Sequence, residues 1–333
     1  MMLKDKNILL FAPSFFGYQT EIVNALKKMG ANVDYFDERP KNNFIVKASI
    51  RTNKNLIKKR IIKYYNSILS YTKSKKYDFV FVVNLEALLP SIIQELRLQQ
   101  TEAKFILYMW DSIQNKKPAL EAFPYFDWGY SFDKSDSQKI EGINFRPLFF
   151  IDKYDADKNI QPLVQTIDLC FLGTVHSDRY NLIHQIKEQV QNLGMKTFFF
   201  MYFPSPILFW YKKFKDFRFY KARYNEFSFT SLKLEEIAEK IMLSKVILDI
   251  QHPKQSGLTM RTVEMLGAKR KLITTNSAIK DYDFYDPENI LVIDRDHPII
   301  DKEFFIKPYK PIAPEIRNRY TIEAWIKELF KLS

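Results

Sequence analysis

Cysteine is almost absent from this 333-residue sequence, because Cys170 is the only one. A single cysteine excludes a disulfide within the chain and a zinc site built from thiolates, and it is typical of proteins from reducing compartments. The four histidines, His176, His184, His252 and His297, lack the spacing of metal ligands. The sequence therefore predicts no protein-only metal site and no cofactor.

Long apolar runs are also missing. The most apolar window, residues 197–211, is interrupted by Pro204 and Pro206, and it is shorter than the roughly 20 residues that a helix needs to cross a bilayer. The apolar run near the N-terminus is broken by Pro13 and is followed by no cleavage pattern of small residues. We therefore expect a first strand in place of a signal peptide, and a cytoplasmic protein.

Two glycine-rich phosphate-binding motifs are absent as well. No GxxxxGK[ST] element occurs, and no GxGxxG follows the first apolar run. These motifs bring backbone N–H groups against the phosphates of nucleotides and dinucleotides. Their absence argues against a P-loop enzyme and weakens the case for a dinucleotide-dependent oxidoreductase.

Basic charge is abundant and unevenly spread within a net charge of +12. Residues 41–76 hold eleven Lys or Arg and no acidic residue, and residues 207–223 hold six basic residues against Asp216 alone. Such surfaces attract nucleic acid, anionic lipid headgroups or phosphorylated substrates, and charge by itself does not choose among them. Because no motif that reads nucleic acid is recognised, we do not expect nucleic acid as the partner.

Apolar residues are interleaved with the lysines of residues 41–76, namely Leu56, Ile57, Ile61, Tyr64, Ile68 and Leu69. This pattern predicts a helix with two possible placements: on an anionic membrane surface, or packed on a sheet with its lysines in water. The aromatic run at 198–211, followed by Lys212, Lys213 and Lys215, predicts a second membrane contact. We expect peripheral attachment at the inner face of the plasma membrane.

Apolar runs of strand length alternate with helix-length segments along the whole chain, which predicts an α/β protein with parallel sheets covered by helices. The predicted strands are residues 6–12, 32–36, 79–83, 105–109, 128–132, 145–150, 167–172, 196–203, 246–250, 271–275 and 289–293. The length exceeds one ordinary core. We expect two tandem Rossmann-like domains with sheets facing a central cleft: residues 1–151, a linker at 152–162, residues 163–312, and a C-terminal helix at 313–333.

Residues 251–276 carry the most specific pattern, because they follow a predicted strand, open a helix after a glycine and end in another strand. Gly257 lets the backbone approach a ligand, and the N–H groups that begin the helix favour phosphate oxygens. Arg261 suits bidentate phosphate contacts, and Glu264 suits a ribose diol. The alternative is an ordinary loop and helix cap with an exposed ion pair.

This segment resembles the donor-binding element of GT-B glycosyltransferases, most closely those of the CgeB-like and lipopolysaccharide-core or capsule type. The match consists of Ser256, Gly257, Leu258, Thr259 and Glu264, followed by a closing strand at 272–276. The resemblance implies that Glu264 binds the donor ribose and that residues 256–259 lie beside the diphosphate or the donor sugar. Ser256 replaces the first glutamate of the retaining signature, and Lys269 replaces a glycine, so the resemblance does not imply retention or inversion.

A second candidate phosphate site lies at residues 171–180, where a predicted strand ends before a helix. In the GT-B family the corresponding turn faces the donor diphosphate, which makes Gly173, Thr174, His176 and Arg179 expected donor contacts. An ordinary strand-to-helix turn explains the same residues.

The first half of the chain supplies candidates for acceptor binding and catalysis. Phe16, Gly17 and Tyr18 follow the first strand, where related folds place acceptor or donor contacts. Asp111 ends another strand and would act as general base if burial raised its pKa. Glu86 is the rival base, and an N-cap role explains Asp111 equally well.

These patterns together predict a metal-independent glycosyltransferase that moves a sugar from a nucleotide-sugar to a cell-surface glycan or lipid-linked acceptor. A nucleotide-sugar epimerase is the alternative enzyme, because the same two-domain architecture serves that chemistry. A non-enzymatic protein that binds nucleic acid through its basic surfaces is the third.

Overall fold

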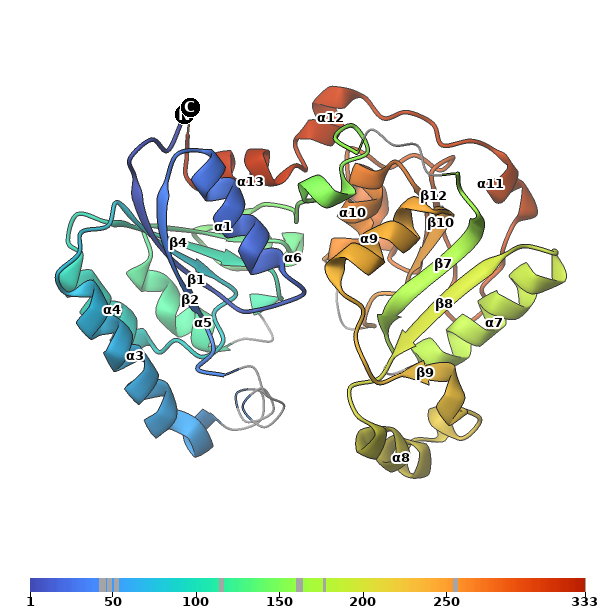
Figure 1. Ribbon diagram of the computed structural model, residues 1–333, viewed down its shortest axis with the longest axis horizontal. Coiled ribbons are helices and arrows are strands. Elements are labelled where there is room, and N and C mark those ends of the chain that lie inside the picture. Colours follow the sequence, from blue (N-terminus) through green and yellow to red (C-terminus); the bar gives the residue numbers. More distant parts are fainter. Residues whose placement is uncertain are drawn as a thin grey trace. The chain divides into compact units, whose positions relative to one another are not determined.

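The computed structural model describes residues 1–41, 46, 50, 54–113, 117–159, 164–175, 178–253 and 257–332. Two of the predicted donor contacts, His176 and Ser256, lie outside these residues. The chain forms two compact units, unit 1 (Met1–Leu148 with Ile322–Ser333) and unit 2 (Phe149–Thr321) (Figure 1). Within the described part of the chain, no helix has the length and apolar character that a bilayer span requires.

Unit 1 is a six-stranded parallel sheet in the order β2-β1-β3-β4-β5-β6. Its strands are β1 (Asn7–Ala12), β2 (Asn32–Asp37), β3 (Phe79–Val83), β4 (Lys104–Met109), β5 (Trp128–Ser131) and β6 (Ile143–Phe145). Its helices are α1 (Tyr18–Lys28), α3 (Lys58–Thr72), α4 (Pro90–Gln99), α5 (Lys117–Ala122), α6 (Lys134–Lys139) and α13 (Ile322–Leu329). The strand order reverses direction between β1 and β3, which makes this pair the topological switch point of the unit.

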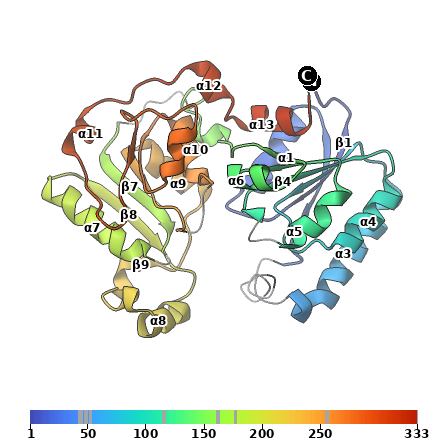
Figure 2. The ribbon, with the colours of Figure 1, turned by 180° about the vertical axis from the view of Figure 1, so that it is seen from behind.

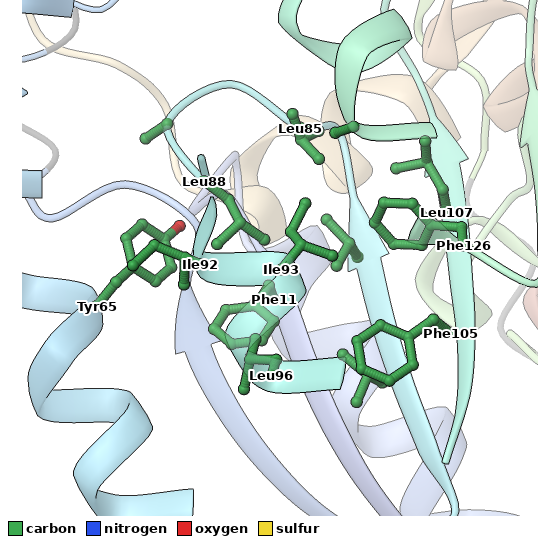
Figure 3. Close-up of a cluster of buried hydrophobic side chains, with 14 of the residues drawn as sticks. Phe11, Tyr65, Leu85, Leu88, Ile92, Ile93, Leu96, Phe105, Leu107 and Phe126 are labelled. Atoms are coloured by element: carbon green, nitrogen blue, oxygen red, sulfur yellow. The ribbon is translucent and has the colours of Figure 1, made fainter. Parts of the chain in front are cut away.

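The central strands of unit 1 are apolar on both faces, as a sheet covered by helices on both sides requires. Helices α3, α4 and α5 cover one face (Figure 2). Alternate strand residues such as Phe11, Val82 and Leu107 form a buried cluster there with residues of these helices (Figure 3). On the other face, Trp325 of α13 lies against Phe81 and Tyr108.

Helix α3 settles the placement of the apolar stripe predicted within residues 41–76. Ile61, Ile68 and Leu69 are buried in the core of unit 1. The basic residues of the helix face water, namely Lys58, Lys59, Arg60 and Lys63. The apolar stripe of α3 therefore packs on the sheet, and the prediction of a membrane-surface helix is wrong for this element. The second placement considered from the sequence is the correct one.

The final helix returns to the first unit. α13 follows the last residue of unit 2 and packs in unit 1, where it buries Ile322, Trp325, Ile326 and Leu329. The Nε1 of Trp128 donates a 2.7 Å hydrogen bond to the carbonyl oxygen of Leu329. The amphipathic helix predicted near the C-terminus is thus a part of the unit formed by the start of the chain.

Unit 2 is a second six-stranded parallel sheet, in the order β12-β11-β10-β7-β8-β9. Its strands are β7 (Ile167–Thr174), β8 (Thr197–Tyr202), β9 (Phe227–Ser228), β10 (Ser244–Asp249), β11 (Lys271–Thr274) and β12 (Ile290–Val292). Its helices are α7 (Arg179–Asn192), α8 (Pro206–Lys215), α9 (Leu234–Met242), α10 (Met260–Ala268), α11 (Lys302–Ile306) and α12 (Pro314–Asn318). The switch point lies between β7 and β10, as in the dinucleotide-binding Rossmann order.

Two predicted strand boundaries need correction. The run at 145–150 is not a strand of its own: β6 is already ending at Phe145, because Pro147 has no N–H to donate to a ladder. The strand predicted to end at Leu172 continues to Thr174, since Gly173 pairs with Met201 of β8. Gly173 is therefore an extended strand residue and does not form the predicted turn.

Candidate functional site

The carboxyl ends of β7 and β10 define the candidate site of unit 2. In open parallel sheets, ligands bind beyond the carboxyl ends of the strands at the switch point. The predicted donor contacts fall on both sides of this point: Thr174 ends β7, Arg179 follows that strand, and residues 257–264 follow β10. The sheet order thus brings together two segments that are about 80 residues apart in the sequence.

Arg179 occupies the first position of α7, directly beyond β7. Its Nη1 donates a 2.8 Å hydrogen bond to the carbonyl oxygen of Thr174. Its Nε is buried and has no hydrogen-bond partner among the described residues. Burial lowers the pKa of Arg179 to about 10, while the nearby Asp249 carboxylate opposes that shift. A partly exposed guanidinium with a buried, unused N–H is suited to receive an anionic ligand.

Arg295, which the sequence analysis missed, joins the same end of the sheet. It follows β12 and forms a two-pronged ion pair with Asp178, at 2.5 and 3.0 Å. It also donates to the carbonyl oxygen of Gln251, at 3.0 Å, and to the hydroxyl of Thr275, at 3.2 Å. A basic residue just past the last predicted strand was the available signal for this second arginine.

Asp249 ends β10 and organises the start of α10. One of its carboxylate oxygens accepts hydrogen bonds from the hydroxyls of Thr259, at 2.5 Å, and Thr262, at 3.0 Å. Thr259 is the N-cap of the helix and accepts from the backbone N–H of Thr262. The predicted helix start after Gly257 is confirmed. Asp249 fixes the first turn of α10 to the end of β10, the strand that pairs with β7.

Arg261 and Glu264 lie together on α10, as their spacing predicts. The Nη1 of Arg261 is 2.5 Å from Oε2 of Glu264, and the Glu264 side chain is only 4% exposed. Leu258 is also buried. The carboxylate of the ion pair is therefore buried and Arg261 is partly exposed, which differs from the exposed pair of the alternative interpretation. The assignment of Glu264 to a ribose remains a prediction.

The loop after β1 presents aromatic side chains in unit 1. Phe15 and Phe16 are both about half exposed, and their ring centroids lie 4.7 Å apart in an edge-to-face arrangement. Phe15 also lies 6.0 Å from Trp110, which follows β4. Phe16 and Gly17 both have positive φ angles, 47° and 85°. Tyr18, the third predicted acceptor contact, is instead buried at the start of α1.

Glu86 lies in an enclosed polar cluster at the switch point of unit 1. It accepts a 3.2 Å hydrogen bond from Nδ2 of Asn84 and lies 3.7 Å from Nη1 of Arg39. Beside it is the fully buried Glu38, whose Oε1 accepts from the backbone N–H groups of Glu86 and Leu88 at 2.7 and 2.8 Å. Burial and the neighbouring Glu86 carboxylate raise the pKa of Glu38 to about 8.

The two candidate bases thus differ in access. Glu86 is buried and held by its polar neighbours, whereas Asp111, two residues past the end of β4, is partly exposed. Since proton transfer needs contact with the substrate hydroxyl, the surroundings favour Asp111. In the described residues, no group of three or more His, Cys, Asp or Glu side chains is arranged to hold a metal ion.

Comparisons with known proteins agree with this architecture. No family model and no curated sequence matches the chain. Among solved structures, the chain is similar to sucrose-phosphate synthase from Thermosynechococcus elongatus, with a TM-score of 0.62, 11% identity and 98% of each chain covered. It is also similar to HepE from Anabaena, solved in complex with UDP and glucose, with a TM-score of 0.60, 9% identity and coverage of 98% and 99%.

A third similar structure is the UDP-GlcNAc 2-epimerase from Methanocaldococcus jannaschii, with a TM-score of 0.55, 10% identity and coverage of 98% and 99%. These similarities extend over nearly the whole chain. The protein has the GT-B fold, built from two Rossmann-like units with parallel six-stranded sheets. The two Rossmann-like domains expected from the sequence are confirmed.

Proposed function

We propose that the protein is a glycosyltransferase that takes a sugar from a nucleotide-sugar donor bound in unit 2. The observation that carries the proposal is the buried Nε of Arg179, which has no hydrogen-bond partner among the described residues and lies at the switch point of the GT-B fold. Arg295 adds a second guanidinium at the same edge of the sheet. Arginines in such a site suit the diphosphate of a nucleotide-sugar, which carries its negative charge on several oxygens.

The donor contacts follow from the two segments beyond β7 and β10. We assign the diphosphate to Thr174, Arg179 and the backbone around Gly257 and Thr259, and the ribose to Glu264. His176 and Ser256 belong to the same predicted set. HepE, one of the similar structures, was solved with UDP and glucose, which makes a uridine nucleotide the first donor to test.

Unit 1 is the proposed acceptor side. The exposed rings of Phe15 and Phe16 beside Trp110 offer apolar faces for a glycan or lipid-linked acceptor. The partly exposed Asp111 is our choice of general base for the acceptor hydroxyl. We propose a reaction that needs no metal, because Arg179 and the backbone N–H groups that begin α10 would stabilise the charge of the leaving diphosphate. The acceptor is proposed to lie at the cytoplasmic face of the plasma membrane.

Calorimetry with two ligands tests the donor site. The Arg179→Gln variant is expected to lose affinity for both UDP and pyrophosphate, by about tenfold or more, since a charged hydrogen bond contributes roughly 1.5–3 kcal/mol. The Glu264→Gln variant is expected to lose affinity for UDP alone, because only UDP has a ribose. Arg319→Gln is the matched control, since Arg319 is an exposed arginine paired with Asp283. Unchanged UDP affinity in both site variants would refute the donor site.

A nucleotide-sugar epimerase is the second candidate, favoured by the similarity to the UDP-GlcNAc 2-epimerase. The two activities differ in their need for an acceptor. Incubation with UDP-GlcNAc alone, followed by NMR of the sugar, is expected to show no interconversion. Rapid formation of the 2-epimer without an acceptor would favour the epimerase.

A further inference from the structure

Helix α8 and the turns that follow it leave an apolar and aromatic surface uncovered. α8 begins at Pro206 and buries Phe209 against Phe203 and Phe227 of unit 2. The opposite side carries exposed residues at helical spacing: Ile207 is 81% exposed, Trp210 45%, Tyr211 61% and Phe214 72%. Large apolar side chains gathered on one exposed surface are unusual in proteins that meet only water.

The surface continues past the end of the helix. Phe217 and Tyr220 are also exposed, and Tyr224 stacks on Trp210 with ring centroids 6.1 Å apart and an interplanar angle of 15°. Phe214 stacks on the same indole, also at 6.1 Å. We call the exposed residues Ile207, Trp210, Tyr211, Phe214, Phe217, Tyr220 and Tyr224 the α8 patch. Ring stacking holds part of this patch in place before any partner binds.

Basic residues accompany the patch, and several remain available to a partner. The segment of residues 207–223 contains six lysines and arginines, and its one acid, Asp216, is paired with Arg218 at 2.6 and 2.7 Å. Lys213 donates to the carbonyl oxygens of Tyr220 and Ala222. Lys215, Lys221 and Arg223 are exposed. The charge beside the patch is therefore positive.

We infer that the α8 patch inserts into the headgroup region of an anionic phospholipid bilayer, with the neighbouring lysines and Arg223 on lipid phosphates. Tryptophan and tyrosine are the side chains enriched at membrane interfaces, and basic residues near them bind anionic lipids. A second copy of the same patch would bring like charges together, which opposes self-association. The inference deepens the proposed function. It rests on that function, because a transferase that acts on a lipid-linked acceptor must reach the membrane surface.

The position of α8 gives this contact a consequence for the donor site. α8 follows the carboxyl end of β8 and lies beyond that end of the strand (Figure 1). All strands of the sheet are parallel, so the candidate donor residues after β7 and β10 lie at the same edge of unit 2. Insertion of the α8 patch would hold that edge of unit 2 near the lipid surface.

Vesicle binding tests the inference with the full chain. We expect the protein to cosediment with vesicles that contain phosphatidylglycerol and to bind much less to phosphatidylcholine alone. The double variant Trp210→Ser with Phe214→Ser is expected to lower the partition coefficient by about tenfold or more, since it removes two large apolar side chains from the inserted surface. Leu98→Ser is the control, because Leu98 is an exposed apolar residue on α4 of unit 1, outside the α8 patch.

A spectroscopic measurement identifies the inserted residue. Brominated lipids are expected to quench part of the tryptophan fluorescence of the wild type, and this quenching is expected to vanish in Trp210→Phe, which keeps an aromatic ring and still binds. Equal binding of wild type and double variant, or no binding of the wild type, would overturn the inference. A concentration-dependent dimer abolished by the double variant would also overturn it, in favour of a second copy. UDP affinity, measured on the same proteins, reports on the proposed function separately.

Discussion

At the scale of single residues, the candidate sites depend on charged side chains that have a buried atom without a hydrogen-bond partner among the described residues. Arg179 has an unused buried N–H, and Glu38 has a buried Oε2 with no partner in the described part of the chain. Such groups cost free energy unless a ligand or a proton satisfies them. They are therefore the positions where a substitution or a pH change has the largest effect.

The raised pKa of Glu38 predicts how the free energy of unfolding depends on pH. Its pKa is about 8 in the folded protein against an ordinary value of 4.5, so the folded state keeps a proton that the unfolded chain releases. The contribution of Glu38 to stability is therefore complete below about pH 4.5, is lost as the pH rises towards 8, and is constant above that. In Glu38→Gln this loss is expected to be absent. Urea unfolding followed across this range measures it, and identical pH dependence in both proteins would contradict the assignment.

The proposed role of Asp111 as general base predicts the effect of its substitution on kcat. Asp111→Asn is expected to lower kcat for sugar transfer, or for slow hydrolysis of the donor, by about a hundredfold or more, which is typical of a lost general base. UDP affinity is expected to stay unchanged, because Asp111 belongs to unit 1. Asp127→Asn, on another surface carboxylate of that unit paired with Arg97, serves as the control. A wild-type kcat in Asp111→Asn would leave Glu86 as the candidate.

At the scale of elements, the close approach of α10 to the chain that enters unit 2 depends on one glycine. A Cβ on Gly267 would lie 2.6 Å from Cγ of Phe150 and 3.0 Å from the carbonyl oxygen of Tyr154. Arg317 strengthens the same junction by donating to the carbonyl oxygen of Gly267 and pairing with Asp155. The helix that carries Glu264 is thus placed by close backbone packing.

Gly267→Ala is therefore expected to lower the free energy of unfolding by about 1–3 kcal/mol, as overpacking of a buried site does. Gly267→Ala is expected to cost less in a Phe150→Ala protein than in the wild type, because removal of the ring removes one of the two clashes. Chemical denaturation of the two single variants and the double variant measures this coupling. Strictly additive effects would show that the ring and the new methyl group do not meet.

At the scale of the whole molecule, the chain begins and ends in unit 1. Figure 1 shows both termini close together at that unit. The fully buried Trp325 of α13 lies against strands β3 and β4, through Phe81 and Tyr108. The stability of unit 1 therefore depends on a helix that all of unit 2 separates from the rest of the unit in the sequence.

Trp325→Ala is expected to destabilise unit 1 by about 3–5 kcal/mol, the usual effect of deleting a large buried ring. Hydrogen exchange is the suitable measurement, because it reports each unit separately. Faster exchange is expected in β3 and β4 and little change in β7 and β10. Trp210→Ala, on the exposed surface of unit 2, is the control. Equal acceleration in both units would show that they unfold as one.

Local sequence was sufficient for the parts of the structure that local physics governs. The alternation of apolar runs predicted both parallel sheets, and the glycine at 257 predicted that a helix, α10, begins after it. The same patterns placed Arg179 beyond a strand, whereas Thr174, also predicted to follow the strand, is its last residue. Backbone geometry and hydrophobic periodicity act over a few residues, so they can be recognised in the sequence.

Only the tertiary structure decided which of two similar segments stays exposed. Both α3 and α8 combine apolar and basic residues, yet α3 buries Ile61 and Ile68 in the core while α8 leaves Trp210 and Phe214 in water. Burial depends on whether a sheet face lies opposite the helix, which amphipathicity does not reveal. The pairing of Arg295 with Asp178 and the proximity of Glu38 to Glu86 likewise arise from strand order, because contacts between distant segments leave no periodic trace in a single sequence.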